Sequence, residues 1–199
     1  MSMPQTALVA AHDIADRTER LDTKGMIRAS LHTNASPHSM VRAFHYIYDV
    51  PMPREPVRLS VTDRFRRLHF ILTEFLETVK ASGFELIPAS DSKHGFDLEH
   101  VEGSQQDTLE MLDGLGDIVY VCYGMAIEMG YDLGQVLREI HASNLTKLDD
   151  NGKPIVNGVG IAAPGRPLHK ADEPEGKILK GPRYMKPQLG RILQLPMEK

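Results

Sequence analysis

The chain has 199 residues, with 27 Asp and Glu against 23 Lys and Arg and a formal net charge of -4; this predicts one domain with an appendage and argues against a general nucleic-acid binder. A single cysteine, Cys122, excludes a disulfide framework and a multi-cysteine metal site. Because no apolar run reaches the roughly 18 residues of a membrane span and the N-terminus lacks a signal-peptide core, we expect a soluble, cytoplasmic protein with no membrane partner.

The first half of the chain predicts two helices after a weakly patterned start. Residues 1–37 are expected to form an N-terminal extension, in which Leu8 to Leu21 could be a short helix. A helix is predicted over 39–50 and is ended by Pro51 and Pro53. Thr62 or Asp63 can cap a long helix that runs to about Ser82, where Gly83 ends it. Residues 88–104, which are poor in apolar side chains, are expected to be a loop.

Two further helices are predicted in the second half. One spans 105–130 and ends at Gly130, and the other begins at a capping-box-like Asp132 and Gln135 and reaches about Leu148. Seven of the 13 prolines follow Asp149. The expected organisation is an extension over 1–37, a helical domain over 38–148 and a loop-rich tail over 149–199 that packs on the domain.

The helix over 105–130 carries an unusual line of acids. Apolar side chains cover most of its circumference, and Glu110, Asp113 and Asp117 fall in a remaining sector of about 60°. A helix this apolar should be buried, and buried like charges are costly unless they are paired or bind a cation. The plainer interpretation is a thin solvated edge, which many amphipathic helices have.

Glu74 and Glu77 form a matching pair on the preceding long helix, where they flank Phe70. Glu-x-x-Glu alone is common on surface helices. Two antiparallel helices could nevertheless bring these acids and the line at 110–117 together around hard divalent ions. Carboxylate oxygens are ligands that Mg²⁺ and Mn²⁺ favour, so the two motifs together predict a magnesium or manganese site.

Candidate phosphate-binding residues lie further along the chain. Asn144 falls near the middle of the apolar face of the predicted helix from Asp132 to Leu148, with Lys147 one turn on; Asn144 could hold an anion or simply bridge backbone groups. Between Lys177 and Arg191 there are five bases and no acid, with Gly181 and Tyr184 among them. Lysines on such a loop can close over phosphates, while a solvated basic tail is the alternative.

These motifs resemble the all-α nucleotide pyrophosphohydrolase superfamily of MazG-like and phosphoribosyl-ATP pyrophosphohydrolase-like enzymes. The resemblance covers roughly 39–187. The stretch from Asp113-Gly-Leu-Gly-Asp117 to Gly130-Tyr-Asp-Leu, then Glu139-Ile-His-Ala-Ser-Asn144-Leu-Thr-Lys147, is similar to a branch frequent in bacteriophages. The ending Gly176-Lys-Ile-Leu-Lys-Gly-Pro-Arg-Tyr184 is also similar to that branch.

The resemblance implies a helical bundle around two long antiparallel helices and Mg²⁺-dependent hydrolysis of a (deoxy)nucleoside triphosphate to the monophosphate and pyrophosphate. It implies that the catalytic and metal-binding acids are Glu74, Glu77, Glu110 and Asp113, with Asp117 as a further metal ligand. The expected phosphate contacts are Asn144, Lys147, Lys177, Lys180 and Tyr184. Many relatives begin the first motif with Glu-Glu, and Thr73 stands in place of the first acid here, so the number of metal ions stays open.

Several further expectations follow. One acid, Glu77 or Glu74, is expected to orient or deprotonate the attacking water. A base pocket is expected near Phe44, His45 and Phe70, and the phage-type resemblance favours purines such as dGTP or dATP. A helix apolar on nearly all sides needs more partners than one small bundle offers, so we expect a homodimer or homotetramer. The alternative function is a non-catalytic helical module that binds a nucleotide or another protein.

Overall fold

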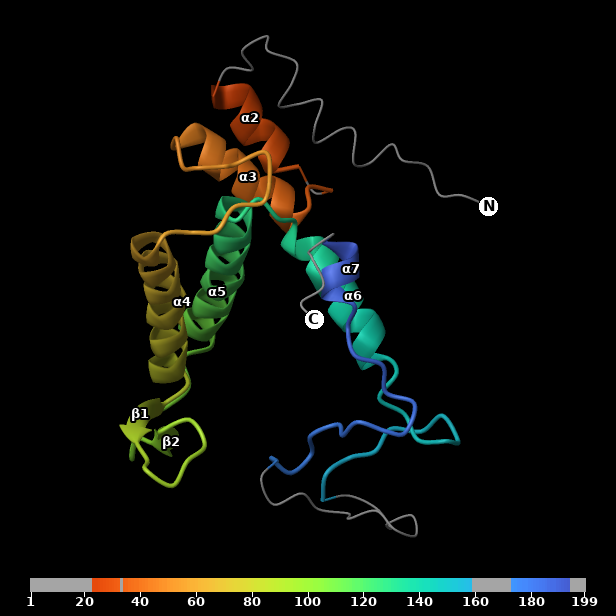
Figure 1. Ribbon diagram of the computed structural model, residues 1–199. Helices are drawn as coiled ribbons and strands as arrows, with labels where there is room; N and C mark the ends of the chain where they lie inside the picture. Colours follow the sequence, from red (N-terminus) through yellow and green to blue (C-terminus); the bar gives the residue numbers. More distant parts are fainter. Residues whose placement is uncertain (1–22, 33, 159–172, 194–199) are drawn as a thin grey trace. The chain divides into compact units, whose positions relative to one another are not determined.

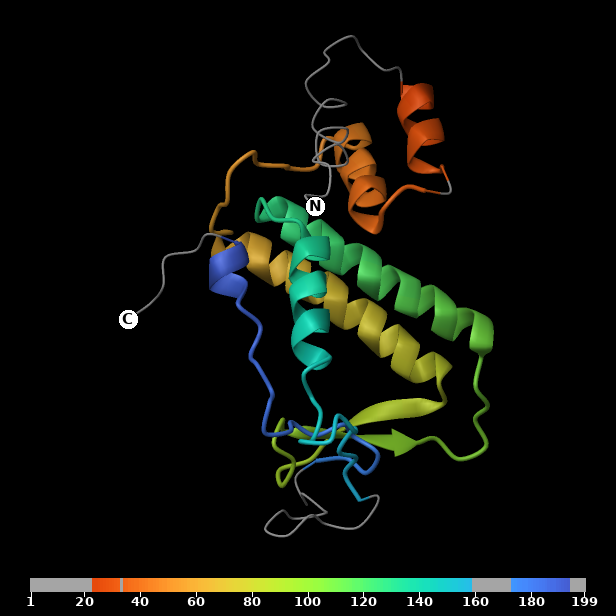
Figure 2. The ribbon, with the colours of Figure 1, turned by 90° about the vertical axis from the view of Figure 1, so that its right-hand side faces the viewer.

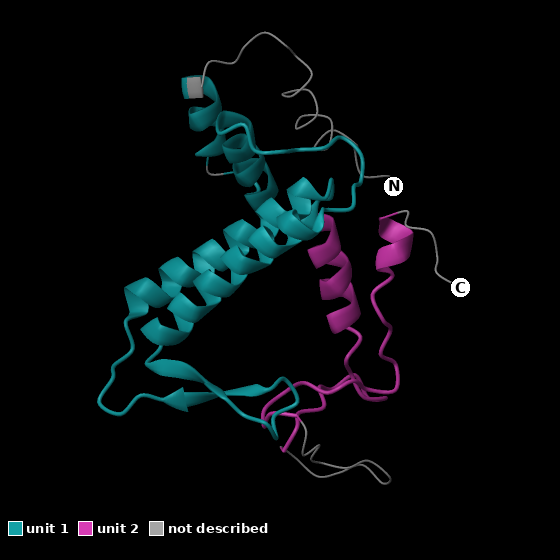
Figure 3. Ribbon diagram, turned by 60° about the vertical axis from the view of Figure 1, so that its left-hand side comes forward, with its two compact units in different colours: residues 1–133 teal, residues 134–199 magenta. Residues whose placement is uncertain are grey.

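The computed structural model describes residues 23–32, 34–158 and 173–193, and the predicted helix over 8–21 lies outside them. The chain divides into two compact units, residues 1–133 and 134–199 (Figure 3). Each is described by itself below. Within the described residues, no helix is both long enough and apolar enough to cross a membrane.

Two long helices, α4 (Val61–Ala81) and α5 (Thr108–Glu128), pack side by side in the first unit (Figures 1 and 2). They run antiparallel, since main-chain hydrogen bonds link the end of each helix to the start of the other or to the segment just before it. Asp107 N donates to Ala81 O at 2.8 Å, and Val57 N donates to Met129 O at 3.0 Å. The predicted all-α fold built around two long antiparallel helices is confirmed.

The caps of these helices agree with the sequence signals to within a few residues. Ser60, rather than Thr62 or Asp63, caps α4 by accepting from Asp63 N at 3.1 Å. Asp107 caps α5 by accepting from Leu109 N at 3.0 Å and from Glu110 N at 3.2 Å. Gly130, at φ +80°, follows the last turn of α5, and a Cβ there would lie 2.6 Å from Glu55 O. This position therefore needs glycine for both its backbone angle and its space.

A β-hairpin connects the two long helices where the sequence predicted a loop over 88–104. Strand β1 (Phe84–Pro88) pairs antiparallel with β2 (Phe96–His100), with Leu86 opposite Leu98. The alternation of Phe96, Leu98 and His100 with acids is a strand pattern. It was missed because the segment holds few apolar residues, and β2 is exposed along its whole length.

Helices α2 (Thr23–Ser30) and α3 (Pro37–Ile47) precede the long pair. Pro37, the last residue of the expected N-terminal extension, is the first residue of α3, and Ser36 caps the helix by accepting from Ser39 N. The core of this unit is small. It consists of Val41, Tyr123 and Ile127, with Met52, Tyr120 and Leu133 packed against it.

The second unit contains most of α6 (Leu133–Asn144) and the short helix α7 (Leu189–Ile192), which the predicted loop-rich tail did not include. Helix α6 ends at Asn144 rather than near Leu148, and Leu148 instead pairs with Pro154 in an antiparallel bridge. A second bridge joins Val156 to Ile178. Asn157, which is fully buried beside it, donates through Nδ2 to Glu173 O at 2.7 Å and to Pro174 O at 3.1 Å.

Contrary to expectation, most of α5 is not buried within a single chain. Its buried residues are Gly114, Tyr123, Gly124, Ile127 and Glu128. Large apolar side chains on both long helices are exposed instead: Val61, Phe65, Leu68, Leu72 and Leu76 on α4, and Leu109, Leu112, Leu115 and Val119 on α5. On α4 they recur at intervals of three or four residues, which places them in one stripe.

Candidate active site

The two acid-bearing helices approach each other closely beside the predicted acids. A Cβ on Gly114 would lie 2.4 Å from Oγ1 of Thr78, so only glycine permits this approach. Thr78 follows Glu77 on α4, and Gly114 follows Asp113 on α5. The Thr78 hydroxyl donates back to Glu74 O at 2.8 Å, which fixes its side chain against its own helix.

The carboxylates of the two helices lie close enough to influence one another electrostatically. Burial raises the pKa of the Glu74 carboxyl, and the negative charges of Glu77, Asp117 and Asp113 raise it further. Two of those three charges belong to the facing helix. The structure therefore brings Glu74, Glu77, Asp113 and Asp117 into one electrostatic neighbourhood, which we call the acidic cluster.

Glu110 stands apart from this cluster. It lies in the first turn of α5, is exposed, and is not among the charges that raise the pKa of Glu74. Among the described residues, no three His, Cys, Asp or Glu side chains converge closely enough to hold a metal ion by themselves. The donor set is nevertheless all carboxylate oxygen, which suits magnesium or manganese. A magnesium shell usually also includes water and substrate phosphates, so it needs few protein ligands.

A buried charge network, which the sequence did not predict, lies at the other end of the helix pair. Arg67 Nη2 donates to Glu128 Oε1 at 2.6 Å, and Arg66 Nη2 donates to Glu128 Oε2 at 3.1 Å. Burial acts to raise the pKa of Glu128, but the hydrogen bonds and charges of the two arginines outweigh it and hold that pKa below its usual range. Glu128 shares a helical sector with the predicted acids, so only the three-dimensional pairing distinguishes it.

Two of the three residues expected around a base pocket are committed to this network. His45 is buried, with Nε2 3.4 Å from Arg67 Nη2 and Nδ1 3.2 Å from Pro51 O. Phe70 lies under the Arg67 guanidinium at 5.9 Å from its ring centroid. Phe44 is different, because its ring is exposed and contacts other aromatic rings.

The predicted phosphate-binding residues lie in the second unit. Asn144, expected on an apolar face, is exposed at the end of α6, where Ser143 is buried instead. Hydrogen bonds join this helix end to the tail, because Ser143 Oγ donates to Met185 O at 2.7 Å and Met185 N donates to Thr146 Oγ1 at 2.9 Å. The segments that carry Asn144, Lys147 and Tyr184 are thus held together.

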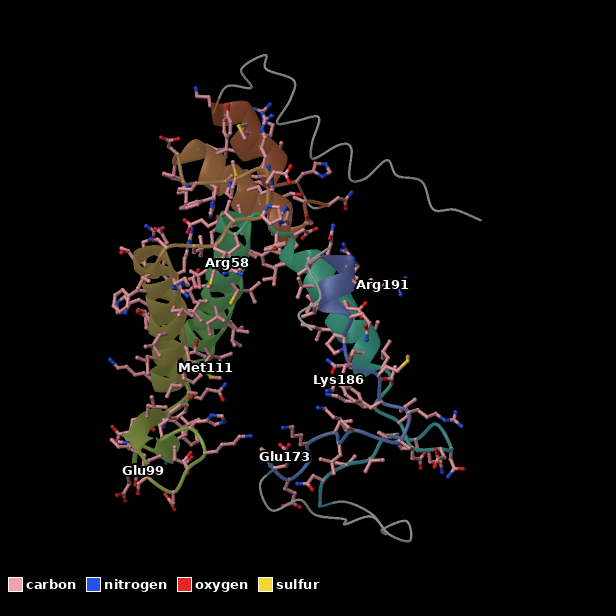
Figure 4. All side chains as sticks on the ribbon, in the orientation of Figure 1. Arg58, Glu99, Met111, Glu173, Lys186 and Arg191 are labelled. Carbon is pink, nitrogen blue, oxygen red and sulfur yellow. The ribbon has the colours of Figure 1, made fainter. Side chains whose placement is uncertain are left out.

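The basic tail is organised by specific contacts. Lys180 Nζ lies 4.8 Å from the ring centroid of Tyr184, and Lys177 forms an ion pair with Glu173. Gly181 passes so close to Leu148 O that a Cβ would lie 1.8 Å from it. Lys186 and Arg191, labelled in Figure 4, extend the same segment.

A cysteine nucleophile has no support in this structure. Cys122 is half-buried on α5, and burial raises the pKa of its thiol. The thiol form therefore predominates near neutral pH.

Comparison with known proteins identifies the family. No curated protein sequence matches the chain. The family model of phosphoribosyl-ATP pyrophosphohydrolase matches residues 41–144, which is more than half of the chain and includes α4, α5 and α6. The chain therefore belongs to the phosphoribosyl-ATP pyrophosphohydrolase family, within the MazG-like all-α superfamily, and is a nucleotide pyrophosphohydrolase that acts on phosphoanhydride bonds.

Proposed function

We propose that the protein hydrolyses a (deoxy)nucleoside triphosphate between the α- and β-phosphates, releasing the nucleoside monophosphate and pyrophosphate. The observation that carries this proposal is the acidic cluster, in which charges from α5 raise the pKa of Glu74 on α4. Family membership supports the reaction class. A polyphosphate brings negative charge of its own, so an acidic site can accept it only together with cations.

Magnesium, or manganese in its place, is the proposed cofactor, in keeping with the typical magnesium dependence of the family. Glu74, Glu77, Asp113 and Asp117 would hold it, and Glu110 would join as the helix-start ligand. Bound there, the metal supplies charge neutralisation and a more acidic water. Within the protein, Glu77 or Glu74 orients the attacking water or takes its proton.

The phosphate chain is assigned to the second unit in this proposal. Asn144, Lys147, Lys177, Lys180 and Tyr184 would contact it, with residues 38–148 as the catalytic domain, 1–37 as an extension and 149–199 as a tail. The contacts that join the end of α6 to Met185 support a shared role for these segments. The ion pair of Lys177 with Glu173 must open, or be shared, when a phosphate binds.

The finer assignments rest on the resemblance of the motifs to the phage-type branch. It favours dGTP or dATP as substrates and the cytoplasm, of the host for a phage-encoded protein, as the site of action. The exposed apolar stripe on α4 supports a homodimer or homotetramer.

Pyrophosphate release from a panel of dNTPs, with and without MgCl₂ or MnCl₂, tests the proposed function. Glu77→Gln and Asp113→Asn should each lower kcat/KM by at least about 100-fold, because loss of a ligand should cost no less than loss of its outer-shell support. Both substitutions remove charge with little change of shape. The helical circular dichroism signal should therefore stay at the wild-type level.

Glu99→Gln is the matched control, because Glu99 is an exposed acid on β2 (Figure 4) and does not belong to the acidic cluster. It should retain wild-type activity. Absence of turnover with every nucleotide, together with no thermal stabilisation by either metal, would indicate a non-catalytic nucleotide-binding or protein-interaction module. An active double variant of Glu77 and Asp113 would refute the assignment of the site residues.

A further inference from the structure

Three aromatic rings form a partly exposed patch between α3 and α5. The ring centroids of Phe44 and Tyr48 are 4.4 Å apart, and those of Phe44 and Tyr120 are 5.6 Å apart in an edge-to-face contact. Phe44 is 40% exposed and Tyr48 is 65% exposed. We call these three residues the aromatic platform. Its two outer rings therefore present partly exposed apolar surface.

The platform continues directly from the acidic cluster. Tyr120 follows Asp117 by three residues on α5, which places the two side chains on neighbouring turns of one face, about 4.5 Å apart along the axis. Burial raises the pKa of the Tyr120 hydroxyl, and the neighbouring Tyr48 and Asp117 raise it further. Tyr120 thus faces the acids on one side and the exposed rings on the other.

We propose that the aromatic platform is the nucleobase subsite of the nucleotide whose phosphates the acidic cluster handles. This inference rests on the proposed function and adds the residues that bind the base. A base stacks on aromatic rings through its π-face, and such stacking needs no sequence-specific hydrogen bonds. The larger face of a purine covers more of the two outer rings, so purines should bind better than pyrimidines.

The other aromatic groups considered are poorer subsites. His45 and Phe70, expected near the base from the sequence, are held by the Arg67 network. Phe65 and His69 are stacked with centroids 5.8 Å apart. Phe65, however, precedes Glu74 by nine residues, about 13.5 Å along α4. Phe70 also lies one helical turn from an acid, Glu74, but its ring lies under the Arg67 guanidinium. The aromatic platform adjoins Asp117 by a single turn through Tyr120 and combines three rings in contact.

Kinetics of Tyr48→Ala and Phe44→Ala with dGTP and dATP test the subsite. Each should raise KM roughly 5- to 150-fold, the range that corresponds to loss of one base–aromatic stack, with a much smaller change in kcat. Tyr48→Phe, which keeps the ring, should recover most of the lost affinity. Tyr46→Ala is the matched control, because Tyr46 is an equally exposed tyrosine of α3 outside the platform. A KM that rises equally in Tyr46→Ala, or stays unchanged in both platform variants, overturns the proposal.

Photo-crosslinking separates this subsite from the proposed reaction. The full chain is irradiated with 8-azido-dATP, with excess dATP as competitor, and the labelled peptides are mapped by mass spectrometry. Competed label on Phe44, Tyr48 or Tyr120 supports the platform even if no nucleotide is hydrolysed, in which case only the proposed function fails. Competed label on Phe65, His69 or Phe70 instead, or no competed label at all, overturns the subsite even in an active enzyme.

Discussion

The buried pair of Arg67 and Glu128 illustrates how much one contact contributes to a small core. Glu128 is 3% exposed and Arg67 is 7% exposed, whereas only a few apolar side chains among the described residues are buried to that degree. A Cβ on Gly124 would lie 2.8 Å from Arg67 Nη1, so the guanidinium fills the space that this glycine leaves. The network therefore fixes how α4, α5 and His45 of α3 meet.

Glu128→Ala should destabilise the fold strongly. It leaves the Arg67 guanidinium buried without its carboxylate, and breaking one side of a buried ion pair costs about 3–5 kcal/mol. Asp63→Ala is the control, because Asp63 pairs with Arg66 at 3.1 Å on the exposed surface, where such pairs contribute about 0–1 kcal/mol. Urea denaturation measures both. Equal effects of the two substitutions would contradict the importance given to the buried pair.

At the scale of elements, the contact of Gly114 with Thr78 sets the spacing of α4 and α5. Gly114→Ala should push the helices apart and cost about 1–3 kcal/mol of stability. Gly116→Ala, with nothing within 4 Å of its Cβ, should instead stabilise α5 by roughly 0.5–1 kcal/mol. Thermal unfolding compares the two. Combining Gly114→Ala with Thr78→Ala, which removes the clashing Oγ1, should recover much of the loss; no recovery would place the strain elsewhere.

The long helices could be predicted from the sequence because their signals are local. Caps, terminal glycines and apolar periodicity defined α4 and α5 to within a few residues, and the family resemblance supplied the antiparallel bundle. The hairpin was missed because Phe84–Pro88 and Phe96–His100 acquire their partners only by folding back. The end of α6 was misplaced for the same reason, since the pairing of Leu148 with Pro154 is not visible as a period.

In the candidate site, too, features with a local sequence signal could be predicted, whereas features that depend on distant contacts could not. Residue types and helical spacing single out the acids as candidates, and the influence of Glu77, Asp113 and Asp117 on the pKa of Glu74 shows that these four lie near one another. The predicted position of Asn144 on a buried face was wrong. Helical periodicity tells which side of the helix Asn144 lies on, but it does not tell whether another segment covers that side. The role of Glu128 was likewise hidden, since Arg66 and Arg67 lie 62 and 61 residues away in the sequence.

At the scale of the whole molecule, the exposed apolar side chains of α4 and α5 predict self-association. Sedimentation at micromolar concentration should show a homodimer or homotetramer, because large contiguous apolar surfaces usually mark an interface. Leu112→Lys places a charge on an exposed apolar position of α5 and should shift the protein toward monomer. Leu31→Lys, at an exposed leucine after α2, should not. A monomeric wild type would contradict the proposal.

The main-chain hydrogen bonds that join Ala81 to Asp107 and Val57 to Met129 separate the frame of the site from its chemistry. They hold both ends of the helix pair without using any acid of the cluster. The acids of α4 and α5 can thus be exchanged for other side chains while the spacing of the helices is kept. Histidines in place of Glu74 and Asp113 would turn the proposed site for hard cations into one suited to zinc or nickel, so the same pair of helices would accept a different metal.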